Sequence, residues 1–122
     1  MAKYFDESEF VCQCGCGFSN WDTDDGQRFI RGLDRARGLA GIPFIIASGC
    51  RCPTHNEAVG GKLDSSHLKI AADIRATTST TKFIIVKALM DVGFTRIFLY
   101  HDKNIIHVDM DETKSSPALR AY

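Results

Sequence analysis

A chain of 122 residues is long enough to bury one hydrophobic core and too short for two ordinary domains, so we predict a single domain over residues 1–122. Its 15 lysines and arginines balance 15 aspartates and glutamates, which disfavours binding to nucleic acid or to an anionic membrane. No apolar run approaches the roughly 20 residues of a membrane span, and the first residues lack the apolar core of a secretory signal, so we expect cytoplasmic synthesis.

Five cysteines form two clusters, Cys12, Cys14 and Cys16 near the start and Cys50 and Cys52 further along. An odd number cannot all pair within one chain. In a reducing compartment, four thiolates around a structural metal are the first alternative to disulfides, and partly buried free thiols are the second. The sequence leaves these three states open.

The first half of the chain predicts a long helix, a short strand and a polar loop. Residues 22–40 repeat apolar positions every three or four residues, and the Asp-Thr-Asp of residues 22–24 can cap this helix. Residues 43–49 form a branched apolar run bounded by glycine, typical of a buried strand. Residues 50–67 contain proline, asparagine and glycines, which predicts a loop with one helical turn at 54–59.

A second strand and a second helix follow. Residues 71–76 predict a short strand, and either Ser79 or Thr80 can cap a helix that runs through residues 81–92. Gly93 suits the left-handed conformation at a helix end, so we expect the helix to stop there.

The last part of the chain predicts a β-hairpin. Residues 96–101 and 104–111 are apolar runs rich in β-branched and aromatic residues, with a turn near 101–104. The tail at 112–122 shows little pattern. Two main helices and about four strands, with hairpins mixed among helices, indicate an α+β domain with a small antiparallel sheet.

The last predicted strand carries polar groups that suggest a site. His107, Asp109 and Asp111 alternate and therefore lie on one face, while Ile105 on the same face favours partial burial. Such a face is either solvated or functional. A single histidine is more often an ordinary surface or core residue than a metal ligand.

A second histidine with an interposed aspartate changes this balance. His67, Asp73 and His107 would supply the three nitrogen and oxygen ligands of a catalytic zinc site, which leaves its fourth position to water. Such a site would make the protein a hydrolase.

Three ordered segments also resemble a known family. "SGCRCPTHNEAVGG" (48–61), "SSHLKIAADI" (65–74) and "HVD" (107–109) are similar to the signature segments of the zinc D-Ala-D-Ala peptidases. This family of carboxypeptidases and endopeptidases shares its fold with the Hedgehog signalling domain. The similarity is strongest with short single-domain bacteriophage members, which the leading "KYFDESEFVCQCGCG" (3–17) also resembles.

The resemblance implies roles for individual residues. His67, Asp73 and His107 take the places of the zinc ligands, and Arg51 takes the place of an arginine that holds or polarises substrate carbonyl and carboxylate groups. The planar guanidinium of Arg51 suits a carboxylate better than lysine would. Its alternative role is a structural ion pair that holds the 50–64 loop.

The sequence departs from the family pattern in the spacing of the first two ligands. The family has a step of seven from His to Asp with a glycine between them, whereas the step from His67 to Asp73 is six and Ile70 stands near the glycine position. Because strand side chains alternate, the loop must absorb this deletion or Asp73 would turn away from the metal.

The general base is the second departure. Asn104 stands where many members carry Glu or Asp, and an amide cannot take a proton at useful pH. Asp109 and Asp102 are the remaining candidates, although Asp109 could instead orient a ligand and Asp102 could be a solvated turn residue. His55 lies in a loop, where exposure is the more ordinary state, and His101 receives no role.

We therefore predict a zinc-dependent peptidase whose substrate is a peptidoglycan peptide. It would cut stem peptides or cross-links at D-alanine. It would act as a monomer on the cell wall, after release as an endolysin or as part of a virion. The alternative is a zinc-bearing binding module that has lost the catalytic base. A small redox or structural domain built on the cysteines is a third hypothesis.

Overall fold

The computed structural model describes residues 3–12, 21, 23–61, 65–68, 70–111 and 113–122. Its first half contains η1 (Glu7–Phe10), α1 (Asp24–Ala40), β1 (Ile46–Ser48), α2 (Pro53–Ala58) and η2 (Ser66–Leu68). Its second half contains β2 (Ala71–Arg75), α3 (Ser79–Asp91), β3 (Arg96–Tyr100), η3 (His101–Lys103), β4 (Ile105–Asp109) and β5 (Ala118–Ala121). None of the described helices is long and apolar enough to cross a membrane.

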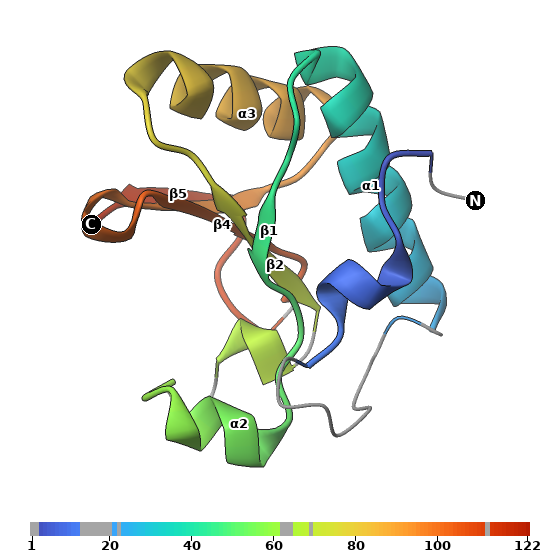
Figure 1. The fold of residues 1–122 in the computed structure, drawn as a ribbon, viewed down its shortest axis with the longest axis vertical. Helices are drawn as coiled ribbons and strands as arrows, with labels where there is room; N and C mark the ends of the chain where they lie inside the picture. Colours follow the sequence, from blue (N-terminus) through green and yellow to red (C-terminus); the bar gives the residue numbers. More distant parts are fainter. Residues whose placement is uncertain (1–2, 13–20, 22, 62–64, 69, 112) are drawn as a thin grey trace.

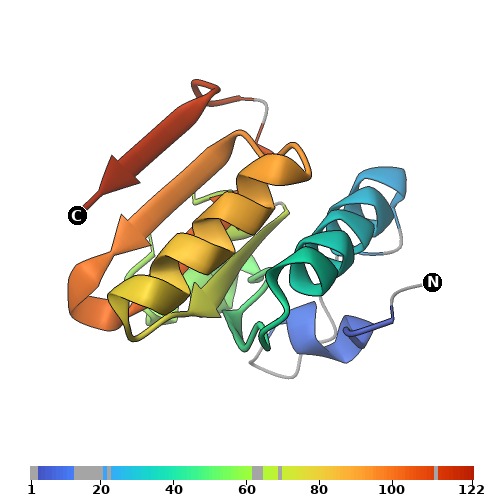
Figure 2. The same ribbon diagram turned by 90° about the horizontal axis from the view of Figure 1, so that it is seen from above.

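The strands form one sheet in the order β1-β2-β4-β3-β5. Every neighbouring pair is antiparallel except β3 and β5, which run parallel. Figure 1 shows α3 and α2 on opposite sides of this sheet, and Figure 2 shows α1 and α3 lying side by side. The prediction of an α+β fold with two main helices and a small antiparallel sheet is confirmed, except that the β3–β5 pair is parallel.

Helix α1 begins and ends where local chemistry allows it. The Thr23 hydroxyl accepts a hydrogen bond from the Gly26 amide at 3.0 Å, which satisfies one of the unpaired donors of the first turn. Gly41 ends the helix with a positive φ of 69°, a conformation that costs glycine little. The helix predicted at 22–40 is confirmed.

Helix α3 has a different cap from the two predicted. The Thr78 hydroxyl accepts from the Thr81 amide at 3.1 Å, and the backbone of Thr78 is extended. Ser79 and Thr80 are already helical, and a capping residue must have extended backbone just outside the helix. The prediction of Ser79 or Thr80 as the cap is therefore wrong, by one residue or by two.

The fifth strand, β5, was not predicted from the tail at 112–122. It pairs with β3 along the edge of the sheet, where the Tyr122 amide donates to the Leu99 carbonyl at 2.8 Å. Most of its side chains are exposed, so its sequence has no apolar alternation to reveal a strand. Its placement depends on pairing with a strand far away in the sequence.

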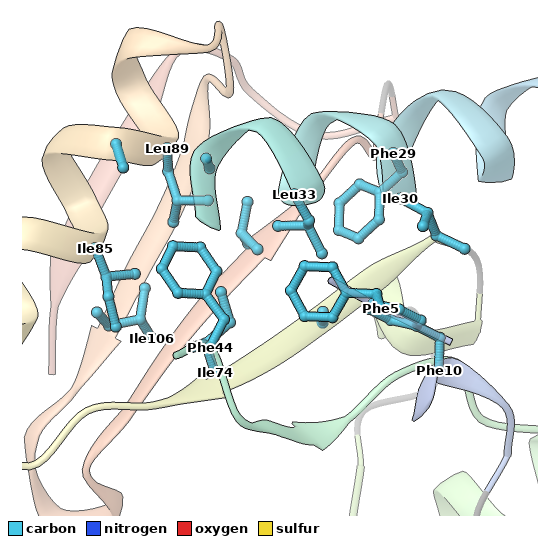
Figure 3. Packing of buried hydrophobic residues seen from close by; sticks show 14 of the residues in the cluster. Phe5, Phe10, Phe29, Ile30, Leu33, Phe44, Ile74, Ile85, Leu89 and Ile106 are labelled. Carbon is cyan, nitrogen blue, oxygen red and sulfur yellow. The ribbon is translucent and has the colours of Figure 1, made fainter. Parts of the chain in front are cut away.

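One face of the sheet packs on α1 and α3 to form the core. Alternate residues of the central strands point to this side, as strand geometry requires. Figure 3 shows the strand residues Ile74 and Ile106 meeting Leu33 of α1 and Ile85 and Leu89 of α3. The polar residues of the same strands must therefore lie on the opposite face.

The cysteine hypotheses fall partly outside the described chain. Cys14 and Cys16 are not among the described residues. Cys12 and Cys50 are buried, and the Cys52 amide donates to the Cys12 sulfur at 3.3 Å. The choice between disulfides, a second metal and thiols stays a prediction.

Candidate metal centre

The three residues predicted to bind metal meet on the polar face of the sheet. His67 lies on η2, Asp73 on β2 and His107 on β4, and one ligand atom from each lies within 4.8 Å of the others. Asp73 Oδ1 is 3.1 Å from His67 Nε2 and 3.0 Å from His107 Nδ1. Strand register explains part of this arrangement, because Asp73 lies directly opposite His107.

The short step between His67 and Asp73 does not turn Asp73 away. The turn of η2 presents His67, and the Arg51 amide donates to the His67 carbonyl at 2.6 Å, which fixes the loop before β2. Among the described residues, Asn104 alone has positive φ without being glycine, so Ile70 does not adopt the left-handed backbone. The loop therefore absorbs the deletion without the family's glycine.

Each histidine is held through the ring nitrogen that faces away from Asp73. His67 Nδ1 lies 2.5 Å from the Gly49 carbonyl oxygen, and because a carbonyl only accepts, Nδ1 donates. His107 Nε2 likewise donates to Asp109 Oδ2 at 2.7 Å. Metal-binding histidines in proteins commonly donate their second N–H to a carbonyl or a carboxylate. The donor set and both of these partners fit a zinc site.

The Gly49 carbonyl is placed by close packing against the first segment of the chain. A Cβ on Gly49 would lie 2.2 Å from the Phe10 carbonyl oxygen, so only glycine fits there. The Cys50 amide and the Trp21 indole both donate to that oxygen, at 2.8 and 2.7 Å. Residues near the start of the chain therefore help to orient His67.

Asp109 lies behind His107 and not in the cleft. Its side chain is fully buried, and Oδ1 accepts from Arg96 Nε at 2.6 Å and from the Asp111 amide at 2.9 Å. Arg96 also donates to the Ser115 carbonyl. Both oxygens of Asp109 are thus engaged, one of them with His107, which favours the orienting role over that of a general base.

Charge and burial shift the pKa values of this cluster. Burial alone would raise the pKa of Asp73, but hydrogen bonds from His107 and His67 outweigh it and hold the pKa below 3.8. Burial would lower the pKa of His107, yet hydrogen bonds to Asp109 and Asp73 raise it above 6.5. In the same way, bonds led by that from His107 outweigh burial and lower the pKa of Asp109. Each carboxylate is kept ionised.

Arg51 lies at the edge of the cluster. Its Nη2 donates to the Ser65 hydroxyl at 2.9 Å, and Nε has no acceptor among the described residues. Burial lowers the pKa of Arg51, while the charge of Asp73 opposes that shift. Arg51 makes no ion pair with a described carboxylate, so the geometry offers no support for a structural ion pair in the 50–64 loop.

Asp102, the other candidate for the base, and its neighbours His101 and Asn104 lie at the surface. Asn104 is exposed and left-handed (φ 53°), a conformation that asparagine tolerates well, so this residue has a structural reason to be there. Asp102 is exposed in η3, and the exposed His101 contacts Lys82 through Nδ1 at 3.2 Å. The backbone of His55 lies in α2, and its side chain is not among the described ones.

A second network, missed from the sequence, joins the two segments that carry the histidines. The Ser66 hydroxyl donates to Asp111 Oδ2 at 3.0 Å, and Lys114 contacts both of them, at 3.0 and 3.3 Å. This network ties η2 to the chain that follows β4. Alternation marks Asp111, but the sequence does not indicate its partners, because Ser66 and Lys114 are distant in the chain and lie outside the predicted strands and helices.

The metal cluster opens into a cleft of about 960 Å³ on the polar face of the sheet. Charged, polar and aromatic side chains line this cleft, among them Arg51, Ser65, His67, Asp73, Arg96, Phe98, Tyr100, Lys103, His107, Lys114, Arg120 and Tyr122. A separate hollow of about 550 Å³ lies between α1 and the start of β3 and does not contain the metal cluster.

The chain matches the family described as Peptidase M15 over residues 3–109 of 122 and belongs to that family. No curated protein sequence gives a significant match. The matched range includes all three residues of the metal cluster and Arg51, so the candidate metal site lies within the peptidase domain.

Proposed function

We propose that this member of the peptidase M15 family is a zinc-dependent peptidase that hydrolyses peptidoglycan stem peptides or cross-links at D-alanine. One observation carries the proposal: His67, Asp73 and His107 converge at a cleft, and each histidine is oriented by a partner on its other nitrogen. Residues that only stabilise a core do not need such an arrangement beside open solvent.

The chain's own residues supply binding and orientation. A zinc ion held by His67, Asp73 and His107 would supply Lewis-acid activation of water and of the peptide carbonyl. Arg51 is placed to donate to a substrate carbonyl or carboxylate, because its Nε has no acceptor among the described residues. The Gly49 carbonyl and Asp109 keep both imidazoles in the tautomers that metal binding needs.

A second candidate function is a zinc-bearing module that binds cell-wall peptide or a structural partner without cutting it. The favouring observation is that Asp73 is the one carboxylate among the described residues that line the cleft, and it is already used by both histidines. A second carboxylate that could act as the general base is thus missing from the described part of the cleft.

The place of action is also a proposal. We propose that the protein acts as a monomer on peptidoglycan, after release from the cell or as part of a virion, and the similarity of its segments to short bacteriophage peptidases supports this. It involves neither nucleic acid nor membrane, in keeping with the balanced charge of the chain.

The test measures zinc content and peptide release from purified cell wall for the wild type, His67→Ala and His107→Ala. We expect about one zinc per wild-type chain, near-complete loss of zinc in both variants, and a rate of release lower by roughly a thousandfold or more. His101→Ala, at the exposed histidine, is the control and should retain zinc and activity. Stoichiometric zinc without turnover would favour the binding module, and equal rates in all four proteins would exclude the peptidase.

A further inference from the structure

The polar face of the sheet continues beyond the metal cluster toward its free edge. Register places Asp73, His107, Phe98 and Arg120 in one row across four strands, from β2 to β5. Figure 2 shows β5 at the edge of the sheet, next to β3. The row therefore leads from the metal ligands to a cation on the last strand, within the same cleft.

The basic side chains of the cleft differ in how they are neutralised. Arg96 pairs with Asp109 and Lys114 pairs with Asp111, so both charges are compensated within the protein. Lys103 and Arg120 are exposed and make no ion pair with any described carboxylate.

Two stacked tyrosines hold these two cations at one end of the cleft. The rings of Tyr100 and Tyr122 stack with centroids 4.8 Å apart and planes 12° from parallel. Lys103 Nζ lies 5.5 Å from the centre of the Tyr100 ring, and Arg120 Cζ lies 5.0 Å from the centre of the Tyr122 ring. Such cation–π contacts restrict the side chains without cancelling their charge.

We infer that Lys103 and Arg120 recognise a carboxylate of the peptide substrate, on about the third residue before the cleaved bond. The inference rests on the proposed peptidase function. Arg120 lies two strands beyond His107, roughly 10 Å away at the usual spacing between strands. An extended peptide covers that distance with about three residues. The protein would thus select acidic stem peptides over neutral ones.

The experiment uses paired stem peptides that differ only at the third residue before the cleaved bond, which carries a free carboxylate or its amide. Binding is measured by fluorescence anisotropy and hydrolysis by kcat/KM, both at low salt. We expect the wild type to prefer the acid in both. Arg120→Gln and Lys103→Gln should each reduce this preference by about three- to fivefold, as for an exposed ion pair, and should change the values for the acid more than those for the amide.

Arg120→Lys keeps the charge and should retain most of the preference, which a purely structural role for Arg120 would not predict. Arg35→Gln removes an exposed arginine from α1, outside this cleft, and should leave the acid-to-amide ratio unchanged. An equal ratio in the wild type, Arg120→Gln and Lys103→Gln would overturn the inference. Failure to cut either peptide would contradict the proposed peptidase, while the anisotropy ratio would still test recognition of the carboxylate.

Discussion

The two ends of the cleft are built in opposite ways. At the metal end, His107 and the residues behind it, Asp109 and Arg96, are buried, and Asp109 joins the other two by hydrogen bonds of 2.6 to 2.7 Å. At the other end, Lys103 and Arg120 are exposed, make no ion pair with a described carboxylate, and lie over the rings of Tyr100 and Tyr122.

This difference shows which tasks each end can perform. Charges removed from water need fixed partners, and fixed partners hold a ligand set in one geometry. Charges left in water keep their capacity to bind a charged group that arrives with a substrate. The metal end is therefore rigid before any ligand binds, and the cationic end is available for recognition.

The largest change should come from breaking the buried pair. Asp109→Ala leaves Arg96 charged and buried without its carboxylate, so we expect unfolding free energy to fall by about 3–5 kcal/mol. Because His107 also loses its acceptor, zinc affinity should fall by about 10- to 100-fold. Chemical denaturation and a chelator competition titration measure the two effects.

Asp91→Ala is the matched control, since Lys87 and Asp91 form an ion pair of 2.7 Å with both side chains at least half exposed (62% and 50%). Removing that pair should cost less than about 1 kcal/mol and leave zinc affinity unchanged. Equal losses of stability in the two variants would mean that burial does not distinguish the two pairs.

A smaller effect is expected when the support of His67 is disturbed. In Gly49→Ala the new Cβ would meet the Phe10 backbone at 2.2 Å, which should destabilise the protein by about 1–3 kcal/mol and weaken zinc binding by moving the carbonyl. Gly38→Ala is the control. Gly38 lies in α1, and a Cβ there would meet only the Tyr4 side chain, at 3.6 Å. Thermal unfolding should show Gly38→Ala to be neutral or stabilising.

Local sequence patterns predict the parts of this fold that form from neighbouring residues. The spacing of apolar residues locates α1, and the apolar runs around the turn locate the β3–β4 hairpin, because each depends on contacts close in sequence. Strand β5 could not be found this way, since it is exposed and its partner β3 lies 22 residues earlier, from Arg96 to Ala118.

The same limit applies to the site. Resemblance to the family points to His67, Asp73 and His107, and the structure brings them together. Alternation places Asp109 on the face of His107 but does not say which ring nitrogen it contacts, because that depends on the side-chain rotamer. The pairing of Arg96 with Asp109 depends on the register of β3 against β4, which the sequence does not specify.

The smallest effect concerns protons at the metal end. Hydrogen bonds to Asp109 and Asp73 raise the pKa of His107 above 6.5 against the effect of burial, so without metal the folded protein holds a proton on this residue up to a higher pH than an ordinary histidine does. Zinc needs the Nδ1 lone pair and must displace that proton. Below the raised pKa, zinc affinity should therefore fall by at least about tenfold per pH unit, and above it the dependence should level off.

The metal-free protein should show the opposite trend. A raised pKa in the folded state contributes stability that is fully present below the unfolded value of 6.5 and is lost as pH rises through the folded value. Asp73 adds no pH dependence in this range, because its pKa lies below 3.8 in the folded protein and its contribution to stability is constant at higher pH. Chelator competition and thermal unfolding between about pH 5.5 and 8.5 measure both trends. His101→Gln, at the exposed histidine, should leave the slope of zinc affinity intact, and a slope near zero below neutrality would mean that His107 does not hold the proton.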